Sequence, residues 1–268
     1  MLLLAADSSN QTGSIAVGNS QEVSTYSLST NDKTARALLP LINQKLTATG
    51  QTVKEIELFA VAKGPGSFTG IRIAMATMKS LAYATGGKII GVNSLAAIAR
   101  TVWEESLRDQ ALAQNPPSTT AQLLDRKKLC VVINAYRKQF FYAMFELGDL
   151  QSKTTGQSVF FRQLREADSR TTLIEQSDLV ERVISEDSLV CGPGLLGLTG
   201  PVRDKIQDRI IESNAACRSA LGAALIAQER WSDNDWDTAM TLLPSYFRGS
   251  AAEEKSAAAS HQNTDQKS

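Results

Sequence analysis

The chain has 268 residues, of which 43% are hydrophobic, and its 28 Lys and Arg residues balance 28 Asp and Glu residues. This length predicts one large domain or two lobes. The zero net charge argues against stable nucleic-acid binding by this chain alone, because phosphate contacts require clustered cations.

The cysteine and histidine content excludes several kinds of site. Cys130, Cys191 and Cys217 lie far apart, which is neither a disulfide framework nor a zinc spacing and suits a reducing compartment. The single histidine, His261, stands in a polar tail over 249–268 that we expect to be disordered. We therefore expect no catalytic residue of the Ser-His-Asp kind and no histidine-based metal site.

The first residues and the hydropathy pattern bear on location. The opening "MLLLAADSSN" lacks the basic region of a secretion signal, and no apolar run approaches the roughly 18 residues of a membrane span. We expect a cytoplasmic protein without a membrane segment.

The first half of the chain alternates strand and helix patterns. Strands are predicted at 2–7, 13–18, 22–28, 58–64 and 88–93. A helix is predicted over 33–48, capped by Asp32 and kinked by Pro40, and another begins near Phe68. This order indicates a mixed sheet with packed helices, an α/β arrangement.

The second half suggests a related lobe behind a polar connection. Residues 104–128 read as that connection, followed by strand patterns at 127–135, 139–147, 158–163 and 188–191 and helix patterns at 172–185 and 214–231. We expect an N-terminal lobe over 1–105, completed by the helix near 214–231, and a smaller C-terminal lobe over 106–213.

A glycine-rich loop, "GPGSFTG" at 64–70, precedes the second helix. Such a loop can bind an anion, because free backbone N–H groups and the helix dipole both point at it. The spacing of Gly64, Gly66 and Gly70 fits neither the P-loop nor the dinucleotide fingerprint. A tight turn that lets the helix pack closely at Gly70 is the alternative interpretation.

The helix after this loop is apolar on nearly every side, so both of its sides must be covered. One side can face its own sheet. The other requires a further segment of this chain or the surface of a partner, and the pattern leaves both open. Methionines and small residues at such a place permit close, adaptable contact.

Several blocks together resemble the TsaB (YeaZ) family. They are "LLLAADSSNQTGSIAV", "TARALLPLI", "GPGSFTGIRIAMATMKSLA", "GVNSLAAIA" and "LPSYFRGSAAEEK", which span nearly the whole chain except the tail. The resemblance implies a two-lobed, ribonuclease H-like fold of the actin, heat-shock-protein and sugar-kinase class. It also implies a close paralogue, the catalytic subunit TsaD. Thr34 and Gln139 depart from the family pattern.

The resemblance implies that the catalytic chemistry of the paralogue is absent. In TsaD, two histidines one helical turn apart hold a metal, and Ser94 and Ile98 stand at those positions here. Neither side chain can hold the metal, so we expect a scaffold with no metal and no cofactor of its own. Whether a nucleotide binds weakly at the subunit junction stays open.

The resemblance also implies the function and the partners. It indicates a non-catalytic subunit that binds TsaD, with the ATPase TsaE, in threonylcarbamoyl transfer to tRNA adenosine, and that forms a homodimer when alone. The expected docking residues are Leu38, Leu39, Ile42, Ile71, Ala74, Met75, Met78 and Leu81. The alternative is an ATP-binding phosphotransferase of the sugar-kinase class, with Asp7, Ser8, Ser9, Gly192 and Gly194 in its phosphate loops. In a non-catalytic subunit these two loops would be vestigial.

Overall fold

The computed structural model describes residues 1–28, 34–112, 121, 123, 128–135, 138–146, 162–163 and 171–247. The predicted helix cap Asp32, most of the strand predicted at 158–163 and the tail at 249–268 lie outside these residues.

The first sheet has the strand order β3-β2-β1-β4-β5, with β2 antiparallel to β1 and β3 and with β4 and β5 parallel to β1. Its strands are β1 (Leu2–Asp7), β2 (Ser14–Asn19), β3 (Val23–Ser27), β4 (Ile56–Ala62) and β5 (Lys88–Val92). Every one of these strands matches its sequence prediction to within two residues. The long buried run of β1 suits a central strand that is covered on both faces.

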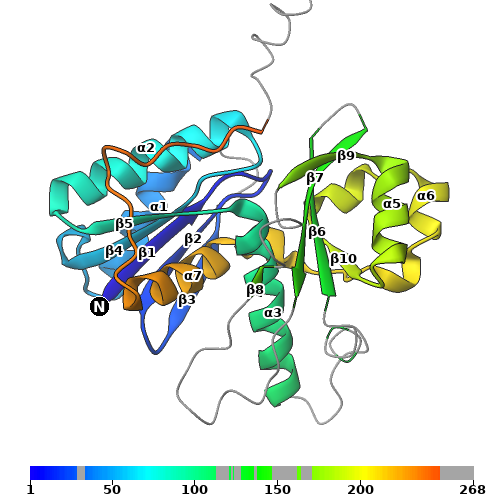
Figure 1. The fold of residues 1–268 in the computed structure, drawn as a ribbon. Coiled ribbons are helices and arrows are strands. Elements are labelled where there is room, and N and C mark those ends of the chain that lie inside the picture. Colours follow the sequence, from blue (N-terminus) through cyan, green and yellow to red (C-terminus); the bar gives the residue numbers. More distant parts are fainter. Residues whose placement is uncertain are drawn as a thin grey trace, which may run out of the picture.

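Helices cover both faces of this sheet (Figure 1). On one face lie α1 (Thr34–Ala48), which contains Pro40, and α2 (Phe68–Thr85). On the other lies α7 (Ala220–Ser232), whose alanines pack against alternate residues of β1 and β4. The predicted helix at 214–231 thus starts later, because its first residues form a 3-10 turn over Asn214–Arg218.

The second sheet runs β10-β6-β7-β8, with β9 also paired to β7. Its strands are β6 (Lys128–Asn134), β7 (Gln139–Glu146), β8 (Arg162–Gln163), β9 (Thr172–Glu175) and β10 (Leu189–Cys191). Its helices are α3 (Ser94–Leu112), α5 (Gln176–Ser185) and the short α6 (Gly200–Asp204). Like the first sheet, it joins an antiparallel pair to a parallel strand, as related lobes would.

Two predictions about the second half are wrong. Residues 172–175 are a strand rather than the start of a helix, because Thr172 and Ile174 pair with Tyr142 and Phe140 of β7. Residues 104–112 continue α3, so the connection predicted from 104 begins later than expected. The predicted lobe boundary at 105/106 falls inside this helix and stays a prediction.

Candidate functional site

The glycine loop before α2 packs directly on the turn that follows β1. A methyl group on Gly70 would overlap the carbonyl oxygen of Ser8, and one on Gly66 would overlap the carbonyl of Ser9. The backbone N–H of Ser67 donates to the Ser9 carbonyl over 2.6 Å. Glycine is therefore required for close approach of two turns. The contacts agree with the tight-turn interpretation rather than with an anion cradle.

The polar groups of the Asp7–Ser9 turn already have partners within the chain. Asp7 Oδ2 accepts a 2.6 Å bond from Ser219 Oγ, and Asp7 Oδ1 accepts a 2.7 Å bond from the backbone N–H of Ser9. Ser8 Oγ donates to the carbonyl of Gly70 over 2.7 Å. All three side chains are buried, and burial raises the pKa of the Asp7 carboxyl although these hydrogen bonds oppose the shift.

The second candidate loop, at Gly192 and Gly194, lies in the other lobe. Gly192 has a φ of 113°, and a methyl group on it would overlap the carbonyl oxygen of Val132 in β6. A methyl on Gly194 would come within 3.0 Å of the same carbonyl. These glycines let the turn after β10 lie against β6. None of the contacts given for the described residues joins this loop to Asp7, Ser8 or Ser9.

Most of the expected docking residues face the interior of this chain. Six of the eight are buried between α1, α2 and the first sheet: Leu38, Ile42, Ile71, Ala74, Met75 and Met78. These six side chains are thus already shielded from solvent in the single chain. Leu39 is 51% exposed on α1, and Leu81 of α2 is half-buried. Docking through the two helices stays a prediction that now rests on their outer sides.

A segment distant in sequence packs along one further side of α2. Residues 237–247, here called the C-terminal strap, run along this helix in Figure 1. Leu242 is buried against the α2 core, and its carbonyl accepts a 2.8 Å bond from Lys79 Nζ. Tyr246 Oη accepts a 2.9 Å bond from Arg72 Nε and stacks on Phe68. The strap thus covers the side of α2 that carries Phe68, Arg72 and Lys79, whereas Ala76, Tyr83 and Ala84 stay exposed.

The two positions that match the metal ligands of the paralogue lie in the first turns of α3. Ser94 and Ile98 are both fully buried, and Ile98 packs in the core against the second sheet. Asn93 Oδ1 accepts from the N–H groups of Leu95 and Ala96 and so caps the helix. Among the residues that the structure describes, no group of three or more His, Cys, Asp or Glu side chains could hold a metal ion.

Sequence comparison with known proteins finds relatives named TsaB and a family model named TsaD. A family model described as "TsaD: tRNA N6-adenosine threonylcarbamoyltransferase" matches residues 29–149. Two proteins named "tRNA threonylcarbamoyladenosine biosynthesis protein TsaB" are similar: that of Escherichia coli K12 is 32% identical over 42% of this chain and 49% of its own length. That of Buchnera aphidicola from Acyrthosiphon pisum is 25% identical over 67% of this chain and 77% of its own length. The E. coli match thus spans about half of that relative.

A solved structure described as "YeaZ from Pseudomonas aeruginosa" superposes with a TM-score of 0.65, at 20% identity, over 92% of this chain and 99% of its own. This likeness shows that the two proteins share an α/β fold of two mixed sheets with packed helices. The resemblance to the TsaB (YeaZ) family that the sequence motifs predicted is confirmed. No helix in the described part of the chain is both long and apolar enough to span a bilayer.

Proposed function

We propose that this chain is a non-catalytic subunit in the formation of threonylcarbamoyladenosine in tRNA, acting in the cytoplasm. It binds TsaD and works with TsaE in transfer of the threonylcarbamoyl group to the adenosine next to the anticodon. The printed names of the similar TsaB proteins and the match to the TsaD family model support this proposal.

The observation that carries the non-catalytic role is the internal use of the Asp7–Ser9 turn. An ATP-dependent phosphotransferase would need free donors and an available carboxylate at such a turn. Here both carboxylate oxygens of Asp7 accept bonds from within the chain, and the turn is buried beneath Gly66 and Gly70. A second observation supports the same role. The positions that match the metal-binding histidines of the paralogue hold Ser94 and Ile98, which are buried and do not replace those ligands.

The outer sides of α1 and α2 are the docking surface that we propose for TsaD. Leu39 exposes half of its surface, and Ala76 and Tyr83 of α2 are exposed, with Tyr83 at 76%. These side chains can leave water on assembly without disturbing the core beneath them. Burying apolar surface contributes roughly 25 cal/mol per Å². The same surface is where we expect the chain to form a homodimer when TsaD is absent.

Reconstitution tests this function. Unmodified tRNA and a threonylcarbamoyl donor are incubated with ATP and with TsaD and TsaE, with or without the chain. We expect modified adenosine to form much faster when the chain is present, and we expect no product from the chain alone. Equal rates with and without the chain would contradict the proposal. Calorimetric titration of the chain alone with ATP and a sugar tests the alternative function. Heat of binding, together with consumption of ATP, would favour the phosphotransferase.

A further inference from the structure

In the described part of the chain the two lobes meet mainly along the helix pair α3 and α7. Two smaller contacts also join them: Phe141 of β7 lies near Phe247 of the strap, and the Asn93 side chain donates to Thr171 Oγ1 over 3.0 Å. In Figure 1, α3 stands between the two sheets. One of its sides, with Ile98 and Val102, packs on the second sheet, whereas Ala97 packs with the alanines of α7 on the first. The angle between the lobes therefore depends on how firmly α3 is held against α7.

At the centre of this helix pair the two backbones are in direct contact. A methyl group on Gly222 of α7 would overlap the carbonyl oxygen of Ala97 in α3. The N–H of Gly222, which has no intrahelical partner in the first turn of α7, donates a 3.0 Å bond to Thr101 Oγ1. Thr101 is fully buried and donates in turn to Ala97 over 2.9 Å. Sliding one helix along the other would break the bond from Gly222 to Thr101, whereas the bond from Thr101 to Ala97 lies within α3.

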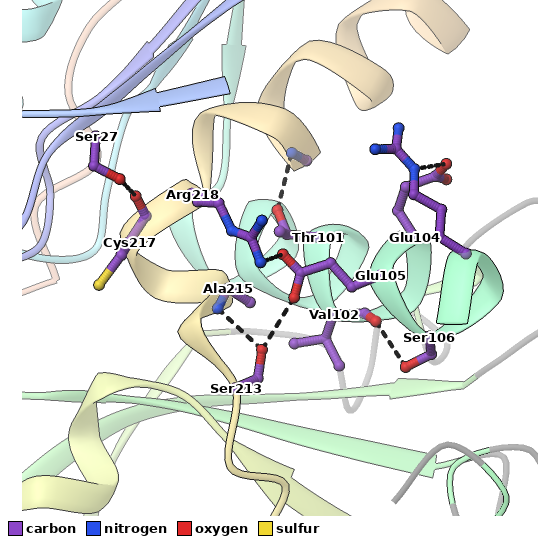
Figure 2. A network of polar contacts seen from close by, with 12 residues as sticks. Ser27, Thr101, Val102, Glu104, Glu105, Ser106, Ser213, Ala215, Cys217 and Arg218 are labelled. Carbon is purple, nitrogen blue, oxygen red and sulfur yellow. Dashed lines mark hydrogen bonds and ion pairs between the residues drawn. The ribbon is translucent and has the colours of Figure 1, made fainter. Parts of the chain in front are cut away.

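Ion pairs hold the helices together on either side of that contact. Arg218, just before α7, pairs with Glu105 of α3 at 2.8 Å, and Ser213 Oγ donates to the same carboxylate over 3.3 Å, as Figure 2 shows. Further along, Arg100 of α3 pairs with Glu229 of α7 at 3.4 Å, and both side chains are largely buried. The Arg100–Glu229 pair is shielded from solvent and is therefore weakened little by salt, whereas Arg218 is 49% exposed.

The segment that carries Arg218 is itself fastened to the first sheet. Ser27 Oγ of β3 donates to the carbonyl of Cys217 over 2.8 Å, and the N–H of Ala220 donates to Ser14 Oγ of β2 over 3.1 Å. Ser219 Oγ donates to Asp7 at the end of β1. Because this segment is bonded to the first sheet, it cannot move with α3. A movement of α3 relative to the segment would therefore stretch or break the Glu105–Arg218 pair.

We propose that the Glu105–Arg218–Ser213 contact is a latch that fixes the angle between the two lobes, so that this chain is a rigid body and does not open and close. Two-lobed proteins that close on a ligand do so about hinges that absorb large backbone changes. Here the crossing segments are bonded to each other and to the first sheet, which leaves no free hinge among them.

A distance measurement between the lobes tests the latch. Spin labels are placed at Tyr83→Cys on α2 and Leu196→Cys after β10, which are 76% and 83% exposed, in a Cys217→Ser background. Cys130 and Cys191 are buried, and burial raises the pKa of Cys130 to about 12, so neither takes the label. Pulsed electron paramagnetic resonance then gives the distribution of distances, with and without ATP.

The full chain with the latch intact should give one narrow distance that ATP does not change. Arg218→Gln and Glu105→Gln should each broaden the distribution at least twofold. Arg209→Gln, which removes an ion pair to Asp187 within the second lobe, is the matched control and should leave it narrow. A distribution that is already broad in the unaltered chain, or one that both latch variants leave narrow while they stay folded, would overturn the proposal.

Hydrogen exchange keeps the test decisive if the variants unfold. In the chain without substitutions, the amide of Gly222 should exchange at least a hundredfold more slowly than that of Leu243, which is 68% exposed. Exchange of Gly222 at the rate of exposed amides would show that the helix pair opens freely, and would equally overturn the latch.

Discussion

Ser8 and Gly70 are joined by a 2.7 Å hydrogen bond from the Ser8 hydroxyl to the Gly70 carbonyl, at a place where Gly70 has no room for a side chain. This relationship fixes the start of α2 on the end of β1 across 62 residues of sequence. It explains why the loop before α2 is rich in glycine.

Gly70→Ala should lower the free energy of unfolding by about 1–3 kcal/mol, because the added methyl group must displace the Ser8 carbonyl. Gly200→Ala is the matched control, since nothing lies within 4 Å of its added methyl group. That control should be neutral or slightly stabilising. Chemical denaturation measures both, and equal stabilities of the two variants would contradict the close packing described here.

Ala74→Arg should prevent folding rather than only weaken assembly. Ala74 is fully buried in this chain, and an unpaired charge there costs several kcal/mol, a large part of the 5–15 kcal/mol that stabilises a typical domain. Ala76→Arg, on the exposed side of the same helix, should change stability by no more than about 0.5 kcal/mol. Circular dichroism separates them; a well-folded Ala74→Arg variant would show that this side of α2 is free.

Two truncations should differ sharply. A chain that ends at Gly249 should keep its melting temperature, because the removed residues lack the apolar side chains needed to bury a face. A chain that ends at Met240 loses buried Leu242 and the bond from the Ser245 N–H to the Lys63 carbonyl. It should lose about 2–5 kcal/mol. Thermal unfolding tests the pair, and equal melting temperatures would rule out a structural role for the strap.

Asp7→Asn should remove part of the pH dependence of stability. The pKa of Asp7 is raised by burial above its ordinary value of 3.8, so the folded state binds this proton more tightly than the unfolded state does. The free energy of unfolding of the wild type should therefore fall as pH rises above about 4. Asparagine can accept from Ser9 and donate to Ser219 without a charge.

The comparison is made as a difference between the two proteins at each pH. Burial also raises the pKa of Glu105 and of Glu229, and these groups lower stability with rising pH in both proteins alike. Their contribution cancels in the difference. Asp7→Asn should gain stability relative to the wild type as the pH rises. A difference that stays constant from pH 4 to pH 8 would argue against a buried carboxylate.

Local patterns were sufficient to predict the strands of the first sheet and the two helices on one of its faces. The period-2 and period-3.6 signals depend on neighbouring residues, and β1, β4 and α2 have buried sides that such signals report. The strand at 172–175 was missed because its conformation depends on pairing with β7, some 30 residues earlier in the chain.

The candidate site shows the same limit more clearly. The apolar circumference of α2 predicted that both sides are covered, whereas in this chain Ala76, Tyr83 and Ala84 are exposed. Periodicity also cannot say which segment packs on a helix. Lys79 and Leu242 are 163 residues apart, and nothing in the sequence around either residue specifies that contact. The bond between Asp7 and Ser219 spans 212 residues, so no local pattern indicates that the polar groups of the first turn already have partners.

Calorimetric titration of TsaD with this chain and with Leu39→Asp tests the central claim most directly. The unaltered chain should bind TsaD stoichiometrically, and Leu39→Asp should remain folded and bind at least tenfold more weakly, about 1.4 kcal/mol. Leu196→Asp is the control, because it places the same charge on an 83% exposed leucine of the second lobe and should bind normally. If the unaltered chain does not bind TsaD, or if Leu39→Asp binds as well as Leu196→Asp, the assignment of α1 and α2 as the docking surface is wrong.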